Sequence, residues 1–139
     1  MFEKILVPLD GSEHSFNALD KAIQIAEKFD GQITLIHVFS AGTMSTPSSE
    51  VCESVQELRK KGESILARAR KEVKAKKIPV KTLIKEGQTV NEILKAATDG
   101  DFSLIVIGAR GISKLREILL GSVSDGVIRH GACPVLVVK

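Results

Sequence analysis

A single-domain open α/β fold, with a parallel five-stranded sheet and helices on both faces, is predicted by three features of the sequence. Short β-branched apolar runs alternate with longer segments of helical period, in the order β-α-β-α-β-α-β-α-β. The runs at residues 5–9 and 104–107 contain no charged side chain, which is typical of strands buried on both faces. The chain has 139 residues, 43% of them hydrophobic, and no linker-like stretch, so we expect residues 1–139 to form one domain.

The first strand and helix are marked by clear boundary signals. Strand 5–9 is followed by turn residues, and apolar residues then recur at helical spacing as far as Phe29. Ser12 is the predicted N-cap of this helix, because its hydroxyl can accept a hydrogen bond from a free backbone N–H. Gly31 is the predicted end of the helix, and residues 33–39 form the second predicted strand.

The middle of the chain is predicted to hold a loop, a long helix and an edge strand. Residues 40–49 (SAGTMSTPSS) are poor in apolar residues and rich in turn formers, so we expect a loop. Strand 80–84 alternates with Lys81 and Lys85, which is typical of an edge strand. Between them, from Val51, lies a long amphipathic helix. Its apolar stripe consists of Val55, Leu58, Ile65, Ala69 and Val73.

The last third of the chain is predicted to add two strands and two helices. Thr89 and Glu92 have the spacing of a capping box for a short helix that extends through Ala97. Strand 104–107 follows, and after a further helical segment the final strand is predicted at residues 135–138.

Charge and hydropathy argue against two classes of partner. The net charge is only +3, and the most basic stretch, residues 59–77, is interspersed with glutamates. We interpret this stretch as the solvated face of a helix and expect no nucleic-acid partner. No apolar run approaches the roughly 18 residues that a membrane span needs, so we expect a cytoplasmic protein without membrane contact. The glutamates are Glu57, just before this stretch, and Glu63 and Glu72 within it.

Neither a metal site nor a nucleophile is predicted. Cys52 and Cys133 lie far apart and match no metal-ligand spacing, and the three histidines have no ligand partner at a suitable distance in the sequence. No serine lies in a nucleophile elbow, so no catalytic residue is assigned. The histidines are His14, His37 and His130, of which His37 is predicted to be packed rather than reactive.

Two loops that follow predicted strands are candidates for a ligand site. Ligands of open α/β sheets bind beyond the carboxyl ends of the strands, and the loops at residues 10–12 and 108–111 follow the first and fourth strands. Gly108 and Gly111 are followed, after nine residues, by Gly121 and then by Ser122 at a predicted helix start. Glycines let an anion approach the backbone, and a helix start favours negative charge.

Charged side chains near these loops suit a phosphorylated ligand. Arg110 and Lys114 can contact phosphate oxygens, and Asp10 can accept a hydrogen bond from a ribose hydroxyl or hold a divalent ion through water. Phosphoryl transfer to water also needs a group that orients the attacking water, and the sequence offers no clear candidate. We therefore expect slow ATP hydrolysis at most.

The same residues also have a purely structural interpretation. Gly108 and Gly111 could only shape the exit from a strand, and Ser122 with Asp125 could form only a helix-capping pair. The chain contains neither G-x-x-x-x-G-K-[ST] nor G-x-G-x-x-G, so the common nucleotide-binding signatures are absent. Spacing by itself leaves both interpretations open.

The whole chain, from about residue 2 to 139, resembles the universal stress protein family, and in particular its ATP-binding branch. The resemblance rests on the opening ILVPLDGS, on His37-Val38 and on the ending CPVLVV. It rests above all on the pattern G-x2-G-x9-G-[ST], which Gly108, Gly111, Gly121 and Ser122 meet in full. One departure is Ser103, which stands where the family usually has an acidic residue before the fourth strand.

The resemblance implies a Rossmann-like sheet in strand order 3-2-1-4-5, of the adenine nucleotide alpha hydrolase type, and ATP as the ligand, with Mg²⁺ expected beside it. It also implies a homodimer formed by pairing the last strands, residues 135–138. The base is expected near the end of the second strand and the phosphates near the glycine pattern. The implied site residues are Pro8, Asp10, Val38, Gly108, Ala109, Arg110, Gly111, Ile112, Ser113, Lys114, Gly121, Ser122, Val123 and Ser124.

Two functional hypotheses follow. The first is an ATP-binding stress-response protein whose partner contacts depend on the nucleotide, with slow ATPase activity at most. The second is a homodimeric interaction module that does not use nucleotide. The intact glycine pattern favours the first, because family members that do not bind ATP typically lack those glycines.

Overall fold

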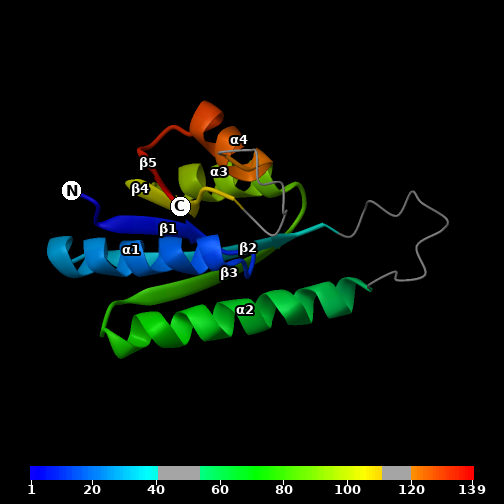
Figure 1. The fold of residues 1–139 in the computed structure, drawn as a ribbon, viewed down its shortest axis with the longest axis horizontal. Coiled ribbons are helices and arrows are strands. Elements are labelled where there is room, and N and C mark those ends of the chain that lie inside the picture. Colours follow the sequence, from blue (N-terminus) through cyan, green and yellow to red (C-terminus); the bar gives the residue numbers. More distant parts are fainter. Residues whose placement is uncertain (41–53, 111–119) are drawn as a thin grey trace.

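The structure is a computed structural model, and it describes residues 1–40, 54–110 and 120–139. Strands and helices alternate along the chain, as predicted (Figure 1). The strands are β1 (Lys4–Pro8), β2 (Gln32–Phe39), β3 (Val80–Glu86), β4 (Leu104–Gly108) and β5 (Val135–Val138). The helices are α1 (Glu13–Phe29), α2 (Val55–Ala75), α3 (Thr89–Asp99) and α4 (Ser122–His130).

The five strands form one parallel sheet in the order β3-β2-β1-β4-β5, which confirms the predicted fold class and strand order. β1 and β4 lie inside the sheet, and all five residues of β4 are buried. β3 lies at an edge, where Lys81 and Lys85 are exposed, as their alternation predicted. The apolar content of β1, β4 and β3 therefore matches their depth in the sheet, whereas β5 is wholly apolar although it lies at the other edge.

Two helices cover each face of the sheet. In Figure 1, α3 and α4 lie together above the sheet and α2 lies below it. Alternate residues of β1 point to opposite faces: Ile5 and Val7 pack in the core under α1 and α2, whereas Leu6 packs in the core under α3 and α4. The winding direction therefore reverses between β1 and β4, which is the position where such folds bind ligands.

The helix boundaries confirm one predicted cap and correct another. Ser12 caps α1, because its side chain accepts a hydrogen bond from the Ser15 N–H at 3.1 Å. The capping box assigned to Thr89 and Glu92 is wrong. The N-cap of α3 is Gln88, whose Oε1 accepts from the Asn91 N–H at 2.7 Å, so Thr89 is already the first helical residue. The Gln88 side chain, rather than that of Thr89, therefore caps the helix.

The long helix α2 begins at a true capping box. Ser54 is its N-cap, and the Glu57 side chain accepts from the Ser54 N–H while the Ser54 hydroxyl accepts from the Glu57 N–H. The expected helix start at Val51 and the predicted loop from residue 41 onward lie outside the described residues. α1 ends at Asp30, which takes the left-handed conformation with φ 54°, one residue before the predicted Gly31.

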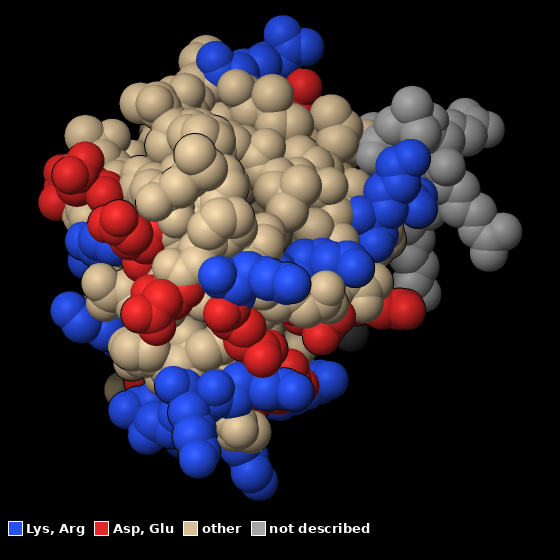
Figure 2. Space-filling model, turned by 90° about the vertical axis from the view of Figure 1, so that its left-hand side faces the viewer, with Lys and Arg blue, Asp and Glu red and all other residues tan. Residues whose placement is uncertain are grey.

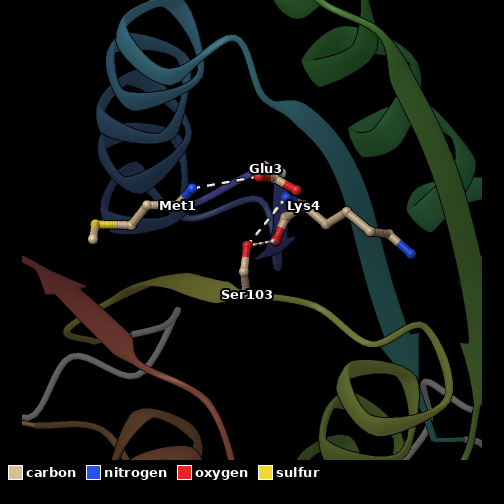
Figure 3. A network of polar contacts seen from close by, with 4 residues as sticks. All are labelled: Met1, Glu3, Lys4 and Ser103. Atoms are coloured by element: carbon tan, nitrogen blue, oxygen red, sulfur yellow. Dashed lines mark hydrogen bonds and ion pairs between the residues drawn. The ribbon is translucent and has the colours of Figure 1, made fainter.

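Ser103 ties the start of β4 to the start of β1 (Figure 3). Its hydroxyl accepts a hydrogen bond from the Lys4 N–H at 3.1 Å and donates to the Lys4 carbonyl at 2.9 Å. The Ser103 N–H donates to the same carbonyl, also at 2.9 Å. The position at which the sequence departs from the family pattern is thus a hydrogen-bonded link between two central strands.

We expect Ser103→Ala to lower the free energy of unfolding by about 1 kcal/mol, because the partly buried Lys4 N–H loses its acceptor. Urea denaturation followed by circular dichroism measures this change. Ser103→Thr is the matched control, since it keeps the hydroxyl and should keep most of the stability. An alanine variant as stable as the parent protein would contradict the structural role of the hydroxyl.

Candidate functional site

A cavity of about 220 Å³ opens at the carboxyl ends of β1 and β4. The two strands are neighbours in the sheet, so the loops that follow them face the same space, as the sequence predicted. The cavity lies where the winding of the sheet reverses. Its lining residues are Pro8, Leu9, Asp10, Ser15, Ile36, Val38, Thr89, Ile93, Ile107, Gly108, Arg110, Gly121, Ser122, Val123 and Ser124.

Every predicted site residue that the structure describes lines this cavity, except Ala109. The loops after β1 and β4, the end of β2 and the start of α4 all contribute to it. Gly111, Ile112, Ser113 and Lys114 lie outside the described residues. The predicted residues at the cavity are Pro8, Asp10, Val38, Gly108, Arg110, Gly121, Ser122, Val123 and Ser124.

Several residues that line the cavity were not predicted from the sequence. Ile36 lies two residues before Val38 on β2, so strand alternation alone could have found it. Thr89 and Ile93 come from α3 at helical spacing, and Ser15 comes from the first turn of α1. No local motif marks these three residues, because only the packing of helices on the sheet brings them to the cavity.

The loop after β1 is held rigidly by its own polar groups. Asp10 Oδ1 accepts a hydrogen bond from the Ser12 N–H at 2.9 Å. Gly11 has φ +88°, a conformation that L side chains rarely adopt, so this turn requires glycine. The Leu9 carbonyl accepts a hydrogen bond from His37 Nδ1 at 2.7 Å, which ties the loop to β2. Asp10 is thereby presented at the lip of the cavity in one orientation.

Ala109 acts behind the cavity rather than in its lining. Its N–H donates to the Val138 carbonyl at 2.7 Å, and its carbonyl accepts from the Gly121 N–H at 2.7 Å and from the Ser124 hydroxyl at 2.8 Å. Ser124 is buried and also contacts the Gly121 carbonyl at 3.0 Å. These bonds hold the end of β4 against the start of α4, so Gly108 and Ser122 face the same space.

The start of α4 is open to a ligand. Its N-cap is Gly121, and no side chain of the described residues caps it. Asp125, the proposed capping partner of Ser122, is instead bonded to Arg129 Nε at 2.9 Å one turn further along. The interpretation of Ser122 and Asp125 as a capping pair is therefore wrong. No described side chain caps the first N–H groups of α4, and these groups with the positive end of the helix dipole favour an anion at the cavity.

Gly108 also has a packing role. A Cβ atom on this residue would lie 2.7 Å from the carbonyl carbon of His14 and 2.8 Å from its oxygen. Backbone atoms cannot move aside as a flexible side chain does, so α1 approaches β4 too closely for any other residue. Gly108 is therefore required for the packing of α1 on β4, whether or not it also contacts a ligand.

The remaining reactive side chains do not assemble a second centre. Among the described residues, no group of three His, Cys, Asp or Glu side chains could hold a metal ion. Burial raises the pKa of the Cys133 thiol, which favours the unreactive protonated form. His14 Nδ1 is buried and has no hydrogen-bond partner within the described part of the chain.

Within the described part of the chain, no helix is long and apolar enough to cross a membrane.

The sheet is open and parallel, and its cavity lies between β1 and β4, where the winding direction reverses. These features define a doubly wound α/β protein with a cavity at the usual ligand-binding position of this class. The chain belongs to the universal stress protein family, whose family model matches residues 1–139. It is similar to universal stress protein YxiE of Bacillus subtilis, with 36% identity over 148 residues and full coverage of both chains.

Solved structures support the same assignment. The chain is similar to the structure of MJ0577 of Methanocaldococcus jannaschii, with 32% identity, a TM-score of 0.86 and coverage of 100% of this chain and 96% of that one. It is also similar to a universal stress protein solved in complex with cAMP, with 26% identity, a TM-score of 0.75 and coverage of 99% and 97%.

Proposed function

We propose that the cavity binds an adenine nucleotide, ATP with Mg²⁺, and that this protein is an ATP-binding member of its family. The proposal rests on one cavity that combines apolar side chains, such as Val38 and Ile93, with a helix start that no described side chain caps. We call the apolar part of this cavity the apolar slot. The slot suits a flat apolar base, and the helix start suits phosphate. The similar protein that was solved with cAMP supports an adenine nucleotide as the class of ligand.

The end of β2 suits the base. β1 pairs with β2 only as far as Pro8, opposite Ile36, whereas β2 continues to Phe39. Val38 therefore has no β1 residue opposite it, and its side chain lines the cavity together with Ile93 from α3. In the proposed complex the base lies between these side chains and bonds to the backbone of the extended strand end.

The two loops suit the ribose and the phosphates. Asp10 uses one carboxylate oxygen to hold the Ser12 N–H, which leaves the other for a ribose hydroxyl. Arg110 and the start of α4 also line the cavity and would hold the phosphates. The predicted contribution of residues 111–114 belongs to the same end of the ligand.

The proposal is tested by denaturing the purified protein, identifying any released nucleotide by chromatography, and titrating ATP with Mg²⁺ into the stripped protein by calorimetry. Co-purified adenine nucleotide or micromolar binding is the expected result. A protein that is empty and takes up no ATP would refute it. Turnover is expected to be slow, because Asp10 is the only carboxylate among the described lining residues, and its two oxygens are assigned to the Ser12 N–H and to the ribose.

We expect Asp10→Asn to weaken ATP binding about tenfold, which corresponds to about 1.4 kcal/mol, with little loss of stability. The asparagine oxygen can still accept from the Ser12 N–H, so the turn persists, but the negative acceptor for the ribose is lost. Calorimetry measures the affinity and thermal unfolding measures the stability. An unchanged affinity for ATP would remove Asp10 from the proposed site.

A second function, a homodimeric interaction module, is favoured by the open edge of β5. This strand ends the sheet, and Leu136 on β5 and Ile128 on α4 are 38% and 42% exposed. Below a few charged side chains at its top edge, the upper part of Figure 2 is largely uncharged. We propose that two copies pair through residues 135–138. Sedimentation equilibrium should then give twice the chain mass, and a monomer at every concentration would contradict the pairing.

A further inference from the structure

Positive charge is concentrated in one part of the chain. Residues 55–85, which comprise α2 and most of β3, carry eleven Lys and Arg and three Glu, a net charge of +8. The rest of the chain carries nine Lys and Arg and fourteen Asp and Glu, a net charge of −5. The small overall charge of +3 therefore hides a strong separation of charge between two parts of one small domain.

Around α2, the fold places most of the basic residues away from the glutamates. A groove between α2 and β3 is lined by Arg70, Lys71 and Lys74, with Glu63 as its one acidic residue. Glu57 is used in the capping box at the start of the helix. Glu72 lies one turn after Arg68, on the flank that faces α1, where Arg68 stacks on the Phe16 ring at 3.9 Å.

The exposed cations of α2 and β3 lie along this edge of the sheet, and we call them the basic strip. All of its members are exposed, and none has a carboxylate oxygen within 4.0 Å among the described residues. Figure 2 shows Lys and Arg gathered along the lower edge, at the level of α2 in Figure 1. The strip runs along a helix about 31 Å long. Its members are Lys60, Arg70, Lys71, Lys74, Lys76 and Lys77 on and after α2, and Lys81 and Lys85 on β3.

The residues around the strip argue against two kinds of partner, a membrane and a single-stranded nucleic acid. Insertion into a membrane requires an apolar helix face, but Leu66, Ala69 and Val73 of α2 are buried against the sheet. Stacking on unpaired bases requires aromatic rings, and residues 55–85 contain none. What remains is a row of exposed cations on a regular helix and strand, which fits a row of phosphates.

We propose that the basic strip binds the phosphate backbone of a nucleic-acid duplex without sequence preference. This proposal departs from the expectation that residues 59–77 form a solvated helix face with no nucleic-acid partner. The strip lies at the β3 edge, so it leaves the β5 edge free for a second copy. It also shares no residue with the cavity at β1 and β4. The proposal is therefore independent of the proposed nucleotide binding.

The test is fluorescence anisotropy of a labelled 20-base-pair DNA duplex with the full chain, at KCl concentrations from about 25 to 200 mM. Each phosphate contact contributes about −0.9 to the slope of log K against log salt. The triple variant R70Q/K71Q/K74Q should flatten this slope by about 2 to 3 and weaken binding at least about tenfold at low salt. An RNA duplex of the same length should bind in the same way.

The matched control is K21Q/K28Q/K95Q, which removes the same charge from exposed lysines outside the strip. It should leave the slope unchanged. Thermal unfolding of both variants verifies that each is folded. Equal loss of binding in the two variants would overturn the proposal, as would a slope near zero for the parent protein. Competition by poly-glutamate as effective as by unlabelled duplex would also overturn it, because the strip would then accept any polyanion.

Discussion

A Ser122→Asp protein is expected to lose about a hundredfold in affinity for ATP while its fold becomes slightly more stable. Ser122 is the first residue of α4 and lines the cavity where the phosphates are proposed to lie. A carboxylate there repels the phosphates, and about 2.7 kcal/mol of repulsion gives the hundredfold loss. The same carboxylate sits at the positive end of the helix dipole, which contributes about 0.3–1 kcal/mol to stability.

The opposite signs of the two effects make the experiment specific. Calorimetric titration of ATP measures the affinity, and urea denaturation of the free protein measures the stability. Ser122→Ala is the control, since it removes the hydroxyl without adding charge and should reduce the affinity only a fewfold. Adenosine carries no phosphate, so it should bind the Asp variant and the parent protein equally. A variant that binds ATP as tightly as the parent protein would move the phosphates away from α4.

Gly108→Ala is expected to lower the free energy of unfolding by about 2 to 3 kcal/mol, even in the absence of any ligand. The new methyl group would lie 2.7 Å from the carbonyl carbon of His14, so α1 and β4 must separate. Overfilling a packed interior in this way typically costs about 1 to 3 kcal/mol, and here the obstacle is backbone. The displacement would also widen the cavity that Gly108 lines.

Gly126→Ala is the matched control for this substitution. It adds the same methyl group, but the nearest atoms are the Val90 side-chain methyls at 2.9 and 3.0 Å, which can rotate. Alanine also favours the helical conformation of α4 by about 1 kcal/mol, so the net change should be close to zero. If Gly108→Ala proved as stable as the control, the close approach of α1 to β4 would not be what requires glycine.

Much of the fold could be predicted from local patterns. Alternating runs of β-branched and helical residues gave the correct number and order of elements, because each pattern reflects how one element buries one face. Lys81 and Lys85 marked the edge strand, and Ser12 marked the start of α1. The strand order came from the family resemblance, since periodicity alone does not say which strands are neighbours.

Local patterns failed where several signals competed or where distant elements meet. Thr89 and Glu92 had the spacing of a capping box, but the longer Gln88 side chain reaches the free Asn91 N–H from one residue earlier. Ala109 was assigned to the site by the family resemblance, yet its backbone groups bond to Val138 and Gly121 and the residue does not line the cavity. Ile93 belongs to the cavity only because α3 packs over the sheet at that point.

The sequence by itself determined the elements, the family and most of the described residues around the cavity, because these depend on residue type and spacing along the chain. Only the tertiary structure decided what Gly108 and the glutamates of α2 do. Gly108 faces the backbone of His14, which is distant in sequence, and the groove beside β3 contains Glu63 but neither of the other two glutamates. The contact of Gly108 and the placement of the glutamates both depend on how one element packs against another. The spacing of residues along the chain does not give the distance between two such elements.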